Sequence, residues 1–245
     1  MSFLRQSNKN AVLSVVLVLA ILLSSAVSYI IKKKVIDSIP TISENSGKCK
    51  TVILDAGHGG EDCGAIGATG VFEKDLNMDI SLSVGKMLCD NGYNVIYTRT
   101  EDKLLYTDAE NVKGIRKISD LKNRVKIAEQ NPDAIFVSIH MNSFGDSKYS
   151  GLQVYYGVKN DLSCSLAKSV QTAVHDMLQP ENNRKIKQGN NIYLLENINL
   201  PSVLIECGFL SNKAECEKLS EKEYQKSLSF SIVCGIIEYM SENSD

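Results

Sequence analysis

The sequence is poor in several residues and patterns on which common protein functions depend. It contains only three histidines, and its seven cysteines are irregularly spaced and form no Cys-x-x-Cys pair. This pattern fits neither a zinc ribbon nor a disulfide framework, so we expect buried free thiols with at most one bridge. No glycine-rich loop ends in Lys-Ser or Lys-Thr, the pattern that binds nucleotide phosphates in P-loop proteins.

Charge is distributed unevenly along the chain. The first 34 residues carry five Lys and Arg side chains and no Asp or Glu, whereas the rest carries 22 basic against 29 acidic side chains, a net charge of −7. A domain this acidic has no electrostatic reason to bind nucleic acid, and no basic patch interleaved with aromatic residues is present. We therefore expect no nucleic-acid partner.

A long apolar run lies near the amino terminus. Residues 11–31 are long enough to cross a bilayer, and a buried core helix is not expected because the run is apolar on every side. Two alternatives remain: a cleaved signal peptide, favoured by the small residues of "SSAVS", and a retained anchor, favoured because the apolar run continues to Ile31. We expect a signal-anchor or transmembrane segment over 1–34, followed by a polar linker over 35–50.

Strand-like and helical patterns alternate along the rest of the chain. Short apolar runs typical of strands cover 51–57, 94–99, 134–142, 151–157 and 202–210. Helical periodicity is present over 76–88, 162–177 and 228–239. This alternation predicts an α/β fold with a largely parallel sheet. No internal repeat or second domain is visible, and 51–241 is expected to form a single domain.

Three polar side chains stand at equivalent places near the ends of predicted strands. His58 follows the first strand in "ILDAGHGG", His140 ends the run "AIFVSIHMNS", and Glu206 lies near the end of "SVLIECGFLSN". Ligands of open α/β sheets bind beyond the carboxyl ends of the strands. The glycines around His58 let the backbone turn sharply and let another group approach closely. These three residues are therefore candidates for one site.

Glu73, in "GVFEKDLN", is a fourth candidate at the first turn of a predicted helix. Taken alone, it is explained by the favourable position of a carboxylate at the positive end of a helix. Together with His58 and His140, however, it completes a set of two imidazoles and one carboxylate, which is typical of catalytic zinc. Glu206 is then available as a general base for a water molecule on the metal.

The motifs together resemble those of the zinc-dependent N-acetylmuramoyl-L-alanine amidases of the amidase-3 type. The resemblance covers about 51–240 and is carried by "LDAGHGGEDCGAIGATGVFEKDLN", "SIHMNS" and "PSVLIECGFLSN". It implies that His58, Glu73 and His140 hold zinc and that Glu206 is the catalytic glutamate. It further implies a six-stranded, mostly parallel sheet flanked by helices, and hydrolysis of the amide between the lactyl group of N-acetylmuramic acid and L-alanine in peptidoglycan. "YTRTED" and "LKNRVKIAEQ" resemble the arginine-containing segments of the family.

One membrane segment, one catalytic unit and no wall-binding repeats resemble the arrangement of the CwlD-type spore-cortex amidases. That group implies removal of stem peptides before a separate muramic acid deacetylase forms muramic-δ-lactam, as needed for germination. It also implies an extracytoplasmic site of action, membrane-anchored or secreted, in the space between the forespore membranes. The passage from His140 to Gly151 is too short for the self-blocking helix of some cell-division amidases. Control of the enzyme's activity would then come from an accessory protein, from the metal supply or from the timing of its synthesis.

Several further residues near these motifs have a simpler interpretation. His175 lies off the apolar face of its predicted helix, and Met141 and Cys207 alternate to the strand face opposite the site. Asp62 is explained equally well by substrate contact and by a solvated charge, as is its neighbour Glu61. The polar segment 182–191 is a candidate substrate-side loop, in which Arg184 and Lys187 are placed to meet stem-peptide carboxylates.

Two other functions are compatible with parts of this sequence. A zinc peptidase or deacylase acting on a different amide would use the same metal chemistry, so only its products would distinguish it. A catalytically silent wall-binding scaffold would be expected to have lost a ligand or the base, yet all four positions are filled.

Overall fold

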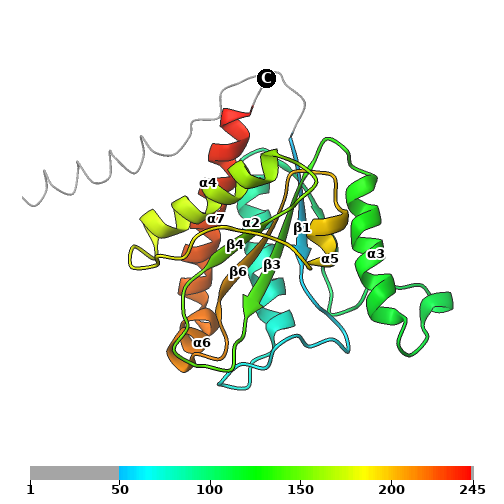
Figure 1. Cartoon of the computed structure of the whole chain (residues 1–245), viewed down its shortest axis with the longest axis horizontal. Helices are drawn as coiled ribbons and strands as arrows, with labels where there is room; N and C mark the ends of the chain where they lie inside the picture. The colour runs from blue at the N-terminus through cyan, green and yellow to red at the C-terminus, as the bar shows by residue number, and fades with distance from the viewer. Residues whose placement is uncertain (1–49, 244–245) are drawn as a thin grey trace, which may run out of the picture. The chain divides into compact units, whose positions relative to one another are not determined.

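The structure is a computed structural model in which residues 50–243 are described, and it consists of a sheet with helices on both faces (Figure 1). The expected membrane segment 1–34 lies outside the described residues, as does the linker 35–50 apart from its last residue. Within 50–243, no helix has both the length and the apolar character that crossing a membrane requires.

Six strands form the sheet, in the order β2-β1-β3-β6-β4-β5. Neighbours from β2 to β6 are parallel, β4 is antiparallel to β6, and β5 is parallel to β4. The sheet is therefore mostly parallel and six-stranded, which confirms the expectation. The strands are β1 (Thr51–Ala56), β2 (Asn94–Tyr97), β3 (Ile135–Asn142), β4 (Gln153–Tyr156), β5 (Lys187–Gln188) and β6 (Ser202–Phe209).

The reversal of β4 follows from the connection that precedes it. Only residues 143–152 join β3 to β4, and they contain no helix. A parallel strand would need a longer crossover, usually through a helix, to return the chain to the starting edge of the sheet. The chain therefore comes back antiparallel and places β4 beside β6 instead of β3.

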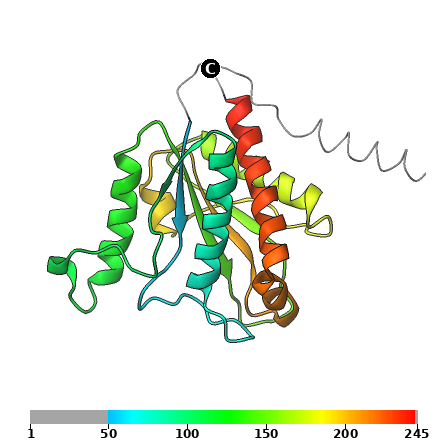
Figure 2. The same ribbon diagram turned by 180° about the vertical axis from the view of Figure 1, so that it is seen from behind.

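Alternation along the strands divides the core into two parts. One face packs against α2 (Glu73–Asp90), α4 (Leu162–Met177) and α7 (Lys222–Glu242), and Figure 2 shows α2 and α7 on this side. The opposite face has a smaller core beside α3 (Arg116–Glu129) and α5 (Tyr193–Asn197). Two short helices complete the described elements, η1 (Asp108–Glu110) and α6 (Lys213–Ser220).

The free cysteines are only partly as expected. All six within 50–243 are free thiols, and Cys207 and Cys216 are buried. Cys89 and Cys164, in contrast, are exposed, so the expectation of general burial is wrong. Both lie on helices at positions that face away from the sheet, and nothing in their sequence spacing marks them as exposed.

Candidate active site

The candidate site lies at the edge of the sheet where β1, β3 and β6 end. These strands are adjacent and parallel, so their carboxyl ends meet at the same edge. His58 follows Ala56, the last residue of β1, and His140 on β3 pairs directly with Glu206 on β6. The structure thus brings together the three side chains that the strand ends single out.

Glu73 joins this group as the first residue of α2. Its Oε1 lies 3.2 Å from His58 Nε2 and 3.0 Å from His140 Nδ1. The carboxylate is only 4% exposed, and it also accepts hydrogen bonds from the backbone N–H groups of Ala65 and Met141. Burial alone would raise the pKa of Glu73, but the two histidines hold it well below its usual range. Glu73 is therefore part of the site and not a solvated charge at a helix end.

One ligand atom from each of His58, Glu73 and His140 lies within 4.8 Å of the other two, a group that could hold a metal ion. Two imidazole nitrogens and a carboxylate oxygen are the donors that zinc and similar divalent metals accept. The rings of the two histidines lie edge to face, with centroids 5.0 Å apart. The fold thus holds the three donor atoms close to one another.

Glycine is required around His58 by close contacts within the site. A Cβ atom at Gly57 would overlap the ring of His140, and one at Gly64 would lie 2.8 Å from His58 Cδ2. His58 itself has a φ of 61°, in the left-handed region that costs a non-glycine residue free energy. Strained, glycine-flanked backbone of this kind is common where a side chain must be presented at a functional site.

Two buried arginines hold the strained turn in place from behind. Arg124 on α3 is 1% exposed, and its Nη2 donates to the carbonyl of His58 at 2.9 Å. Arg99, just beyond β2, donates from Nη2 to the carbonyl of Gly57 at 2.9 Å. Arg124 is neutralised by Asp55 and Asp120, at 2.5 and 2.9 Å. These are the arginines of "YTRTED" and "LKNRVKIAEQ", and here they position the backbone of the His58 loop.

Asp62 orients the ring of His58. Its Oδ2 lies 3.0 Å from His58 Nδ1, while the other ring nitrogen, Nε2, faces Glu73. A carboxylate on the far nitrogen fixes the tautomer and the direction of a ligating histidine. Sequence reasoning left Asp62 between substrate contact and solvated charge, and this positioning contact was missed. The local sequence gives no signal for it, because the contact depends on the unusual turn at His58.

Glu206 lies beside the ligand group, and its carboxylate is poorly satisfied. Its Oε2 is buried and has no hydrogen-bond partner within the described part of the chain. Burial raises the pKa of Glu206 to about 7, against the opposing influence of His140. A buried carboxylate with an unused oxygen and a pKa near neutrality is suited to accept and return a proton. The orphaned oxygen also fits a site that takes up water or substrate beside a metal.

The residues to which the sequence gave no catalytic role lie away from this centre. Met141 is 3% exposed and Cys207 fully buried, and both pack in the core on the opposite face of the sheet. His175 on α4 is 41% exposed and contacts Asp176, its neighbour in sequence. The third histidine is thus separate from the ligand group.

Comparison with known proteins gives a consistent result over the whole described domain. Residues 52–238 match the family model of N-acetylmuramoyl-L-alanine amidases. A germination-specific N-acetylmuramoyl-L-alanine amidase of Bacillus subtilis is 36% identical over 196 residues, which are 80% of this chain and 82% of the relative.

Solved structures agree with the sequence relatives. The CwlD amidase of Clostridioides difficile, determined in complex with the GerS lipoprotein, is 41% identical, with a TM-score of 0.76 over 79% of this chain and 100% of that one. The amidase AmiC2 of Nostoc punctiforme is 30% identical, with a TM-score of 0.69 over 80% of this chain and 99% of that one. Together with the matched family model, these similarities show that the chain belongs to the N-acetylmuramoyl-L-alanine amidase family.

Proposed function

We propose that this amidase uses zinc held by His58, Glu73 and His140, with Glu206 as its general base, to release stem peptides from peptidoglycan. The observation that carries this proposal is the convergence of three ligand atoms within 4.8 Å beside a buried, unpartnered carboxylate oxygen. The scissile bond is the amide between the lactyl group of N-acetylmuramic acid and L-alanine, the bond after which the family is named.

The geometry divides the chemistry between the metal site and Glu206. Bound zinc would polarise the amide carbonyl and lower the pKa of water in the site. Glu206 Oε2 takes a proton from the attacking water as the water oxygen bonds to the carbonyl carbon. The same oxygen then returns the proton to the nitrogen of L-alanine as the C–N bond breaks. Asp62, Arg99 and Arg124 keep the His58 loop in position throughout.

Product analysis tests the activity directly. Zinc-loaded protein incubated with peptidoglycan should release free stem peptides that begin with L-alanine, identified by mass spectrometry. Fragments cut inside the stem peptide would make the protein an endopeptidase instead. If wild-type protein released nothing even after addition of an extract of spore-forming cells, which would supply a required partner, the scaffold interpretation would replace the amidase proposal.

We further propose that the protein acts on spore-cortex peptidoglycan outside the cytoplasm, between the forespore membranes. The germination-specific name of the Bacillus subtilis relative and the similarity to the CwlD structure support this role. In this proposal 1–34 form the anchor and 35–50 a linker, and a separate deacetylase completes muramic-δ-lactam. The lipoprotein GerS bound to the CwlD structure supports an accessory protein of similar kind for this chain.

Complementation tests the spore role. A Bacillus subtilis strain without its germination-specific amidase should regain muramic-δ-lactam in its cortex and germinate when it expresses this chain with its amino terminus. Expression of Glu206→Gln at the same level should restore neither. If the active chain leaves the cortex without lactam although it is secreted and cleaves peptidoglycan in vitro, the cortex assignment is wrong.

The raised pKa of Glu206 predicts an acid limb in the activity profile. The base works only when deprotonated, and its pKa of about 7 means that the active fraction falls as pH decreases through neutrality. We expect kcat/KM to decline between pH 8 and pH 5.5, approaching tenfold per pH unit at the acidic end. Zinc content measured at each pH separates this effect from metal loss. A flat profile with full zinc occupancy would contradict the assignment.

Asp62→Asn is expected to weaken zinc binding without unfolding the protein. Loss of the carboxylate that orients a ligating histidine typically lowers metal affinity about 10- to 100-fold. Competition with a chromogenic chelator measures the change. Asp176→Asn is a matched control, because Asp176 makes the same contact with His175 away from the site. Equal zinc affinities for the two variants would show that Asp62 has no positioning role.

A further inference from the structure

A second feature lies on the same face of the sheet as Glu206. A cavity of about 250 Å³ opens over β4 and β5, and Gln153, Tyr155, Arg184, Lys187 and Phe209 are among the residues that line it. Two of its lining side chains are cationic, and none of them is acidic. The cavity is therefore electrostatically suited to an anion.

Gln153, which lines the cavity, places it beside the catalytic residues on the sheet. Gln153 pairs directly with Glu206 across the antiparallel ladder, so their side chains stand on the same face, about 5 Å apart at Cβ. Tyr155 follows on that face, two residues along β4, and pairs with Lys187 on β5. The order across this edge is thus His58 just beyond β1, His140 on β3, Glu206 on β6, and the cavity over β4 and β5.

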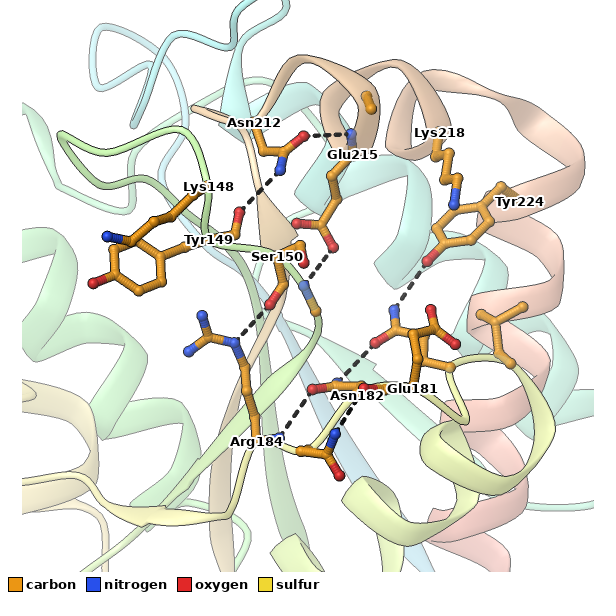
Figure 3. Close-up of a pocket in the computed structure, with 15 residues that line it drawn as sticks. Lys148, Tyr149, Ser150, Glu181, Asn182, Arg184, Asn212, Glu215, Lys218 and Tyr224 are labelled. Atoms are coloured by element: carbon orange, nitrogen blue, oxygen red, sulfur yellow. Dashed lines mark hydrogen bonds between the residues drawn. The ribbon is translucent and has the colours of Figure 1, made fainter.

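The guanidinium of Arg184 is fixed by contacts with three other residues. Its Nε donates to the carbonyl of Ser150 at 2.7 Å, its Nη1 to Gln153 Oε1 at 3.3 Å, and its guanidinium stacks 4.4 Å from the ring centroid of Phe209. Figure 3 shows the bond to Ser150, with the two Nη atoms directed away from it. A guanidinium fixed in this way loses little side-chain entropy when it binds a carboxylate.

No carboxylate within residues 50–243 forms an ion pair with Arg184 or Lys187. The charge of Arg184 lowers the pKa of Glu215, although burial raises it more. The two carboxylate oxygens of Glu215 accept hydrogen bonds from the backbone N–H groups of Gly151 and Phe209, at 2.7 and 2.8 Å. Figure 3 shows the first of these hydrogen bonds, which the Glu215 carboxylate accepts from the backbone N–H of Gly151. The guanidinium therefore has hydrogen-bonding capacity that the described protein leaves unused.

We propose that Arg184, assisted by Lys187, binds a carboxylate of the stem peptide on the leaving-group side of the scissile amide. This inference rests on the proposed roles of the ligand group and Glu206. The carbonyl faces the ligand group of His58, Glu73 and His140, and the nitrogen faces Glu206, which returns its proton. The peptide that continues from this nitrogen then crosses β4 towards β5. Adjacent strands lie about 5 Å apart, so the cavity is one to two residues from the reacting amide.

The carboxylate that this distance selects is one carried by the second residue of the stem peptide. A carboxylate and its carboxamide at that position have nearly the same shape and differ by a single charge, so the pair isolates the contribution of that charge. Arg184 is expected to prefer the free acid, because charge-assisted, two-pronged hydrogen bonds to a carboxylate are stronger than those to an amide.

The test compares two muropeptides that carry the carboxylate or the carboxamide at this position and are otherwise identical. Zinc-loaded wild-type protein should cleave both and favour the free acid. Arg184→Gln should lose about 10- to 100-fold in kcat/KM on the free acid, mainly through KM, and change little on the amide. Lys187→Gln should show a smaller loss of the same kind. Lys185→Gln, which removes a charge from the same segment, should behave as wild type.

Three results would overturn the proposal in distinguishable ways. If wild-type protein cleaves both substrates equally, the amidase function stands and the subsite does not exist. If Arg184→Gln loses activity equally on both, with unchanged zinc content and thermal midpoint, its role is structural. If zinc-loaded wild-type protein cleaves neither substrate nor peptidoglycan, the proposed function and this subsite fail together.

Discussion

Glu206→Gln is expected to retain zinc and fold while losing about 10²- to 10⁴-fold in kcat, the range of a general acid–base contribution. Glutamine has nearly the same shape, but its amide accepts no proton at neutral pH. Water attack would then proceed without proton transfer to the protein, and the leaving nitrogen would have no donor. The substitution also removes a buried carboxylate whose Oε2 has no partner in the described chain. We therefore expect no loss of stability.

The measurement combines single-turnover kinetics with zinc content and thermal unfolding. Glu217→Gln is the control, since Glu217 is exposed on α6 and its carboxylate forms an ion pair with Lys213, at 3.9 Å, away from the site. Near-normal turnover by a zinc-loaded Glu206→Gln protein would exclude Glu206 as the base. Zinc loss in this variant would instead indicate that Glu206 supports the metal, which the distances among the three ligand atoms do not suggest.

The position of Glu206 was accessible from sequence because parallel strands align their ends. His58 follows one apolar run, and His140 and Glu206 lie near the ends of two others. Sheet geometry brings such ends to one edge. Glu73 was harder to identify as a site residue from the sequence, because a carboxylate at the start of a helix is also explained by its favourable interaction with the helix dipole. In the structure the Glu73 carboxylate contacts both histidines, which a position at a helix start alone does not explain.

Other parts of the site depend on contacts between distant segments and could not be found in this way. Asp62 meets His58 only because the backbone turns into the left-handed region at His58. Arg124 is 66 residues from the carbonyl that it supports. The strand β5 has only two residues, both polar, and so has no alternating pattern to recognise. The sequence marks segment 182–191 as a candidate substrate-side loop, but it does not show that the guanidinium of Arg184 is fixed by contacts with other segments.

The site also contains two carboxylates whose pKa values are shifted in opposite directions. The carboxylate of Glu73 is ionised and contacts the two histidines, whereas burial raises the pKa of Glu206 to about 7. Two carboxylates in different environments are thus suited to different roles, which in our proposal are those of metal ligand for Glu73 and proton carrier for Glu206. The raised pKa of Glu206 arises chiefly from burial, with a further contribution from Glu73. Removal of a ligand should therefore disturb the base as well as the metal.

His140→Ala is expected to lose both zinc and turnover. The substitution removes one of three donors and leaves Glu73 Oε1 without its 3.0 Å contact to His140 Nδ1. Zinc affinity should fall by more than about 100-fold, beyond the range seen when only a supporting residue is lost. Activity at limiting zinc should fall with it. Equilibrium dialysis in buffers of known free zinc, followed by activity assays on the same samples, measures both quantities.

His175→Ala provides the matched control, because it removes the histidine that the structure places outside the ligand group. It should bind zinc and turn over as wild type does. Proton competition gives a second signature: burial opposes the charge on His58, but the hydrogen bonds that its ring donates to the carboxylates of Asp62 and Glu73 raise its pKa to about 9 in the metal-free protein. Zinc must displace that proton, so its affinity should rise from pH 6 to pH 8 with proton release. Wild-type zinc affinity in His140→Ala, or affinity independent of pH, would show that the metal binds elsewhere.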